Sequence, residues 1–157
     1  MIGDFLMKKT TPRLIICGVL IALILSFIWG NSCMTGESSG RFSSLVGSIL
    51  STVLPFFDPE STVGHFILRK IGHFSEFAAL GLCLSWLYGM LMQHKWQMLT
   101  LPLVSGIVAA SIDESIQLFI PDRHGSIVDV GIDTSGVIVG ILVLYLGWLL
   151  LRKLRKT

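Results

Sequence analysis

The chain has 157 residues, of which 52% are hydrophobic and only 14% charged, and its mean hydropathy is +0.76. Soluble domains usually carry about 25% charged residues, so this composition argues against a soluble domain and predicts a membrane protein. The length fits one compact domain. The formal net charge of +2 says little about partners by itself, and we expect no nucleic-acid partner.

Four apolar segments are long enough to cross a bilayer, which takes about 20 residues. They cover residues 14–30, 71–92, 98–120 and 127–151. The first is long for the apolar region of a signal peptide, so we expect it to be retained as a helix. The sequence therefore predicts an all-α integral membrane protein, a four-transmembrane-helix bundle forming a single domain over residues 1–157.

Basic residues gather in the segments that four crossings would place on one side of the membrane. They are Lys8, Lys9 and Arg13 before the first span, Lys95 between the second and third, and Arg152, Lys153, Arg155 and Lys156 after the fourth. Cytoplasmic loops carry an excess of Lys and Arg. We therefore predict a multi-pass protein of the cell membrane, in contact with the lipid bilayer, with both termini cytoplasmic.

The segment between the first two spans has a helical period of its own. From Phe42 to Leu54 apolar residues recur at spacings of three and four, serine and threonine occupy the other side, and Pro55 follows. This pattern predicts an external amphipathic helix at about residues 41–54. It would lie along the outer membrane surface or pack over the bundle as a lid.

Polar side chains interrupt the spans near their predicted outer ends. They are Lys70, His73 and Glu76 in the second span, Asp113, Glu114 and Gln117 in the third, Arg123 in the following loop, and Asp129 and Asp133 in the fourth. Ionisable groups inside a membrane are costly and need partners or a function. Because all of them lie within a few turns of one side, we expect a single inward-facing site in the outer leaflet.

A structural interpretation competes with the functional one. Asp129 could serve only to favour the start of the fourth helix, basic side chains could extend to the headgroups, and the network could be architectural. Adjacent acids on an otherwise apolar helix are harder to explain in this way. We favour a site for Asp113, Glu114, His73 and Arg123.

Two stretches carry a resemblance to a known family. They are Lys70-Ile71-Gly72-His73-Phe74-Ser75-Glu76-Phe77, and Asp113-Glu114-x-x-Gln117-x-x-x-Pro121-x-Arg123 followed by Asp129, Gly136 and Gly140. With them the sequence resembles the VanZ-like family of small bacterial membrane proteins. The resemblance implies a four-helix membrane protein linked to low-level resistance to glycopeptide antibiotics, teicoplanin in particular, but no particular reaction. Phe77 stands where the family usually has Tyr, and Asp133 where it usually has Asn.

The first functional hypothesis is binding of a lipid-linked component of the cell envelope, such as a polyprenyl-linked intermediate or a lipoglycopeptide. Arginine suits two-point contacts with phosphate or carboxylate, and an apolar groove between helices would take the lipid tail. The residues expected to bind this ligand are Lys70, His73, Gln117, Arg123, Asp129 and Asp133.

The second hypothesis is a membrane hydrolase or transferase acting on the same substrates. Its catalytic groups would be His73, Glu76, Asp113, Glu114 and Arg123. Mg²⁺ or Ca²⁺ could be held by the oxygen atoms of Asp113, Glu114, Asp129 and Asp133. No Ser-x-x-Lys nucleophile motif is present. A third hypothesis gives the polar layer only a role in helix packing or a partner interface.

Overall fold

The computed structural model describes residues 2–35, 61–92 and 94–154 and places nearly all of them in helices. The helices are α1 (Ile2–Ser32), α3 (Thr62–Leu91), α4 (Lys95–Gln117) and α5 (Ile127–Leu154). No strand occurs in this part of the chain, which confirms the all-α prediction. The amphipathic helix predicted at residues 41–54 lies outside the described residues.

Each helix contains a segment long and apolar enough to cross a bilayer. These segments are Thr11–Ser32, Phe66–Leu91, Trp96–Gln117 and Ile127–Leu151. Their outward faces carry large apolar side chains, as in α5, where Leu146 is 55% and Leu150 63% exposed. Such surfaces suit a hydrocarbon environment, so the four-span prediction is confirmed.

Helix ends differ from the predicted span limits for local reasons. α3 begins nine residues before position 71 because Ser61 caps it, its side chain accepting a hydrogen bond from the Gly64 backbone N–H (3.0 Å). α4 ends at Gln117 rather than at position 120. The chain there tightens into turns, with the Ile120 N–H donating to the Gln117 carbonyl (3.2 Å).

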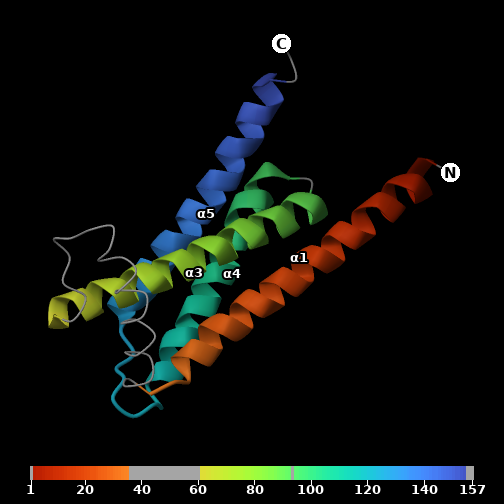
Figure 1. The fold of residues 1–157 in the computed structure, drawn as a ribbon. Helices are drawn as coiled ribbons and strands as arrows, with labels where there is room; N and C mark the ends of the chain where they lie inside the picture. The colour runs from red at the N-terminus through yellow and green to blue at the C-terminus, as the bar shows by residue number, and fades with distance from the viewer. Residues whose placement is uncertain (1, 36–60, 93, 155–157) are drawn as a thin grey trace.

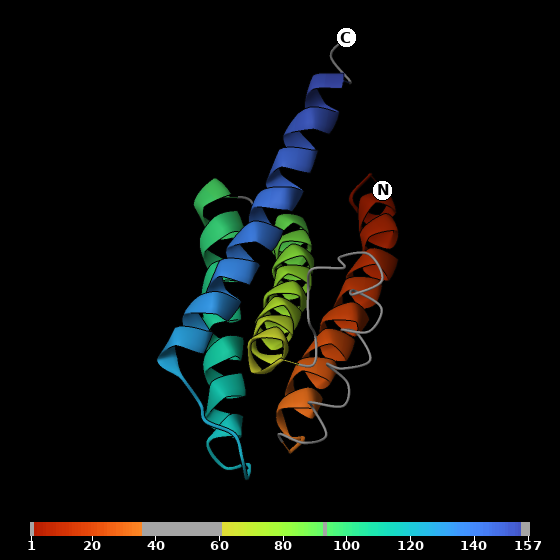
Figure 2. The ribbon, with the colours of Figure 1, turned by 60° about the vertical axis from the view of Figure 1, so that its left-hand side comes forward.

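α3 is the central helix of the bundle. It packs against α1, α4 and α5, most extensively against α5, and Figure 2 shows it between α1 and the other two helices. Apolar side chains from the four helices form the core between them, namely Ile28, Phe77, Leu80, Leu84, Ala109, Ala110, Val137 and Ile141. Phe77 is fully buried among them, so this position belongs to the core.

Glycine allows α5 to lie directly on the backbone of α3. A Cβ atom at Gly136 would collide with the Phe74 carbonyl oxygen, and one at Gly140 would collide with the Ala78 carbonyl oxygen. Small residues four apart permit this close approach of two membrane helices. The spacing of Gly136 and Gly140 therefore places both glycines on the α5 face that contacts α3.

The two ends of the bundle differ in what they carry. The start of α1, the turn between α3 and α4 and the end of α5 lie at one end (Figure 1). The end of α1, the start of α3 and the loop between α4 and α5 lie at the other. The basic segments therefore gather at the first end, whereas the polar residues of the spans approach the second.

Replacing Gly140 by alanine should destabilise the bundle. The added methyl group meets backbone atoms of Ala78 and Leu82, which cannot move without shifting the helix. We expect a loss of about 1–3 kcal/mol, the usual cost of overpacking, measured by unfolding in detergent micelles. The matched control is Gly131→Ala on the same helix, where no atom lies within 4 Å of the added Cβ. Equal stability of the two variants would contradict the close contact.

Candidate functional site

Four buried side chains from three helices converge near the end of the bundle that holds the α4–α5 loop. They are His73 of α3, Asp113 and Glu114 of α4, and Asp133 of α5, and each offers a ligand atom within 4.8 Å of the others. They are far apart in the sequence and meet only through the packing of the helices. The predicted convergence of polar groups from three spans is therefore confirmed.

His73 stands between two carboxylates. Its Nδ1 atom lies 3.7 Å from Asp113 Oδ2 and 3.6 Å from Asp133 Oδ1. Both aspartates are 0% exposed and His73 is 8% exposed. These separations exceed a normal hydrogen bond but lie within ion-pair distance, so the imidazole lies close to both carboxylates without a hydrogen bond from Nδ1 to either.

Gln117 ties the acids of α4 to the end of α1. Its side-chain amide donates toward Asp113 Oδ2 (3.1 Å), Glu114 Oε1 (3.2 Å) and the Ser32 hydroxyl (3.3 Å). An amide nitrogen has two hydrogens, so these three acceptors share two donors. Gln117 is predicted as a ligand-binding residue, and its observed contacts all orient neighbouring side chains.

Glu114 fixes the loop between α4 and α5. Its Oε2 atom accepts a hydrogen bond from the Ser126 backbone N–H (2.8 Å). The Ser126 hydroxyl in turn accepts from the Val128 N–H (3.2 Å), the bond of a helix N-cap. Gly125 lies so close to the Glu114 carbonyl oxygen that a Cβ there would collide with it. The loop is therefore held against the last turns of α4.

Arg123 reaches from this loop into the bundle. It is 5% exposed, and its Nη2 atom donates to the Asn31 carbonyl at the end of α1 (3.1 Å). Burial, followed by repulsion from Arg69, lowers the pKa of the Arg123 guanidinium, and Asp113 and Glu114 act in the opposite direction. The guanidinium is thus a desolvated cation beside the buried acids.

Lys70 and Asp129 form a separate ion pair between α3 and α5. The Lys70 ammonium also lies 5.1 Å from the centre of the Phe66 ring. Asp129 is predicted both as a metal ligand and as a ligand-binding residue, but it lies outside the group around His73 because Lys70 holds it. Asp129 also lies in the first turn of α5, where the positive end of the helix dipole stabilises its negative charge.

Several buried polar atoms in this region have no hydrogen-bond partner among the described residues. They are His73 Nδ1, Glu76 Oε2, Asp113 Oδ1, both carboxylate oxygens of Asp133, and Nε and Nη1 of Arg123. Buried polar groups are nearly always hydrogen-bonded, and exceptions mark places with a chemical role or a bound ion or water. All of these atoms belong to residues predicted for the site. Gln117, Glu114 and Asp129 are also predicted for the site, but their side chains have partners within the protein.

Sequence reasoning missed the contribution of the first helix. Ser32 and Asn31 complete the polar region from α1, accepting from Gln117 and Arg123 respectively. Both residues follow directly on the predicted span at residues 14–30, and polar residues at that position are a signal for an inward-facing helix end. Ser32 is 1% exposed, which its sequence position alone does not indicate.

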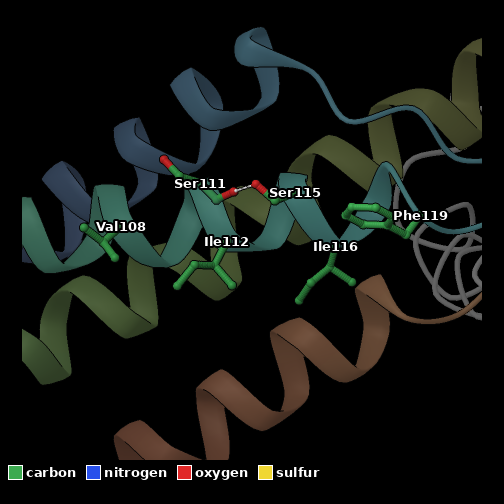
Figure 3. A pocket seen from close by; sticks show the side chains of 6 residues that line it. All are labelled: Val108, Ser111, Ile112, Ser115, Ile116 and Phe119. Carbon is green, nitrogen blue, oxygen red and sulfur yellow. Dashed lines mark hydrogen bonds between the residues drawn. The ribbon is translucent and has the colours of Figure 1, made fainter.

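A shallow hollow of about 370 Å³ lies on the outward side of α4, lined by Val108, Ser111, Ile112, Ser115, Ile116 and Phe119 (Figure 3). The Ser111 and Ser115 hydroxyls donate to the carbonyls of Ile107 (2.9 Å) and Ser111 (2.6 Å), within their own helix. The hollow is therefore effectively apolar. It lies along the same helix turns as Asp113 and Glu114, whose side chains are buried.

Four apolar spans around a buried cluster of ionisable groups define a multi-pass membrane protein with a polar site inside its bundle. The sequence model of the VanZ/LLP1 family matches residues 14–151, nearly the whole chain. The protein belongs to this family, which is associated with teicoplanin resistance. No curated protein and no solved structure matches the chain.

Lys70 and Asp129 should be energetically coupled. In a double-mutant cycle of Lys70→Met and Asp129→Asn, we expect a coupling free energy on the order of 1 kcal/mol, because the two contacting groups are only 16% exposed. Unfolding in detergent measures each variant. The control cycle combines Lys70→Met with Asp122→Asn in the exposed loop, where the two effects should add. Additivity in both cycles would contradict the ion pair.

Proposed function

We propose that the cluster around His73 and Arg123 binds the polar headgroup of a lipid-linked envelope component or lipoglycopeptide at the outer leaflet of the cell membrane. The orientation is supported by the basic segments at the opposite end of the bundle, because positively charged loops stay in the cytoplasm. Both termini are then cytoplasmic, and the α4–α5 loop faces outward.

The observation that carries the proposal is the buried guanidinium of Arg123. Its Nε and Nη1 atoms have no partner in the described part of the chain, although the side chain is almost completely buried. Guanidinium groups bind phosphate and carboxylate through two parallel hydrogen bonds. A headgroup anion would satisfy these donors, while its hydroxyl or amide groups would donate to the free oxygens of Asp113 and Asp133.

The apolar hollow on α4 supports a lipid-linked rather than a free ligand. Ile112, Ile116 and Phe119 present apolar side chains along the same turns that carry Asp113 and Glu114 inward. A polyprenyl or acyl chain could lie in this hollow, within the hydrocarbon, while its headgroup reaches the polar cluster past the end of α4. The free energy of binding would then come from both parts of one molecule.

Native cysteines test the orientation. Cys33, at the end of α1 that adjoins the site, is exposed, whereas Cys17 and Cys83 are buried. A membrane-impermeant maleimide added to intact cells should label Cys33 and give no signal in Cys33→Ser. In the Cys33→Ser background, Leu154→Cys at the other end of the bundle should be labelled only after permeabilisation. Labelling of Leu154→Cys alone in intact cells would reverse the orientation.

Replacing Arg123 by glutamine should weaken headgroup binding about tenfold or more, because charge-assisted hydrogen bonds are lost. Binding of a polyprenyl phosphate to the detergent-purified protein is measured by native mass spectrometry. The matched control is Arg69→Gln, which removes an exposed guanidinium from α3 near the same end.

The comparison of these two variants distinguishes a ligand-binding role of Arg123 from a purely structural one. We expect Arg123→Gln to stay folded and inserted, because its Nη2 bond to the Asn31 carbonyl can be replaced by the glutamine amide. If both arginine variants bind the polyprenyl phosphate as the unchanged protein does, the headgroup proposal is wrong. If Arg123→Gln unfolds while Arg69→Gln does not, the guanidinium is structural.

His73 supports an enzyme as the second candidate function. The Nδ1 atom of His73 faces two carboxylates, which could orient the imidazole so that its other nitrogen, Nε2, acts as a general base, and Arg123 would stabilise developing negative charge. Incubation of the purified protein with polyprenyl phosphates and diphosphates, with products identified by mass spectrometry, distinguishes the two. Turnover lost in His73→Gln would favour the enzyme, and saturable binding without products would favour the binding protein.

A further inference from the structure

We propose that His73, Asp113 and Asp133, with Glu114 as a fourth ligand, form a binding site for a divalent transition-metal ion. Zn²⁺ is the ion that the site should prefer. The site does not depend on the headgroup proposal, because all four ligand atoms come from the protein. It also differs from the site expected from sequence, since it contains an imidazole and leaves out Asp129.

The separations of the ligand atoms fit a metal ion between them. Ligand atoms that each lie about 2.1 Å from a tetrahedral zinc ion are about 3.4 Å apart. His73 Nδ1 lies 3.7 Å and 3.6 Å from the facing oxygens of Asp113 and Asp133, and the ligand atoms of all four residues fall within 4.8 Å. The two His73 separations need to shorten by only a few tenths of an ångström, and the widest separations in the group, up to 4.8 Å, by about 1.4 Å, which side-chain rotation supplies.

The same atoms lack other partners. His73 Nδ1 and both carboxylate oxygens of Asp133 are buried and form no hydrogen bond with any described residue. Asp133 is 0% exposed, so water outside the bundle does not satisfy it. A cluster of acids alone would not indicate a metal, but a buried imidazole nitrogen without a hydrogen bond, facing the wholly unpartnered carboxylate of Asp133, does.

Charge balance favours a bound cation. Three carboxylates, those of Asp113, Glu114 and Asp133, are buried against one buried guanidinium, Arg123, within the described ranges. Uncompensated charge inside a membrane bundle is strongly unfavourable. A divalent ion would offset the two excess negative charges and join the three helices at one point.

The donor set selects the kind of metal. Mg²⁺ and Ca²⁺ prefer oxygen ligands only, whereas imidazole with carboxylate suits Zn²⁺, and also Mn²⁺ and Fe²⁺. Gln117 would act as a positioning residue, since its amide hydrogen-bonds Asp113 and Glu114 and fixes their orientation. Glu114 keeps lone pairs beyond its bonds to Gln117 and Ser126, which is sufficient for a fourth ligand.

Metal analysis of the full-length protein in detergent tests the site. The protein is stripped with EDTA, dialysed against Zn²⁺, Mn²⁺, Mg²⁺ or Ca²⁺ separately, and its metal content measured by plasma mass spectrometry. We expect one Zn²⁺ per chain, retained in the presence of excess Ca²⁺ and Mg²⁺, and a concentration-dependent rise in unfolding temperature. No stoichiometric Zn²⁺, or stronger binding of Ca²⁺ or Mg²⁺, overturns the proposal.

Three variants assign the ligands. His73→Gln and Asp133→Asn should each lower Zn²⁺ affinity at least about tenfold and abolish the thermal shift. Asp129→Asn on the same helix as Asp133 should bind Zn²⁺ as the unchanged protein does, because Lys70 holds that carboxylate outside the group. Co²⁺ in place of Zn²⁺ should give visible absorption bands that His73→Gln lacks. Unchanged binding by both ligand variants, or its loss in Asp129→Asn alone, overturns the assignment.

The metal and headgroup proposals fail separately. Zn²⁺ is measured without any lipid, and polyprenyl phosphate binding is measured on both EDTA-treated and Zn²⁺-loaded protein. Zn²⁺ binding with no effect of Arg123→Gln on lipid binding would remove the headgroup proposal alone. Arg123-dependent lipid binding to a protein that takes no Zn²⁺ would remove the metal site alone.

Discussion

The close contact between α3 and α5 determines the geometry of the polar site. Gly136 and Gly140 let the α5 backbone lie on the carbonyls of Phe74 and Ala78. His73 precedes Phe74, and Asp133 lies one turn before Gly136, so this contact brings the aspartate to the imidazole (3.6 Å). A larger residue at either glycine would separate the helices and with them the two groups. The glycine spacing is thus as important for the site as the ionisable residues.

The polar region consists of a satisfied part and an unsatisfied part. Gln117, the Glu114–Ser126 bond and the Lys70–Asp129 pair have their partners within the protein and hold helix ends and loop in place. The imidazole of His73, the carboxylates of Asp113 and Asp133 and the guanidinium of Arg123 retain unpartnered atoms. Because burying such atoms is costly, the first part is best explained as support for the second. A site of this kind suits the proposals of a bound headgroup and a bound cation.

Membership in the VanZ/LLP1 family connects this architecture with resistance to teicoplanin. A polar site inside an apolar bundle, with an apolar hollow on the adjacent surface of α4, fits ligands that combine a polar head with a lipid tail. Asp133 adds a carboxylate to the cluster. This carboxylate increases the demand for a cation in this chain.

The sequence by itself determined the fold class, the four spans and the residues around which the site forms, because hydrophobic length and ionisable groups within it are local properties. Only the tertiary structure decided which polar residues meet: it grouped His73 with Asp113, Glu114 and Asp133, paired Asp129 with Lys70, and added Asn31 and Ser32 from α1. Partner choice depends on helix rotation and on distances between helices, and the spacing of residues along one helix does not contain that information.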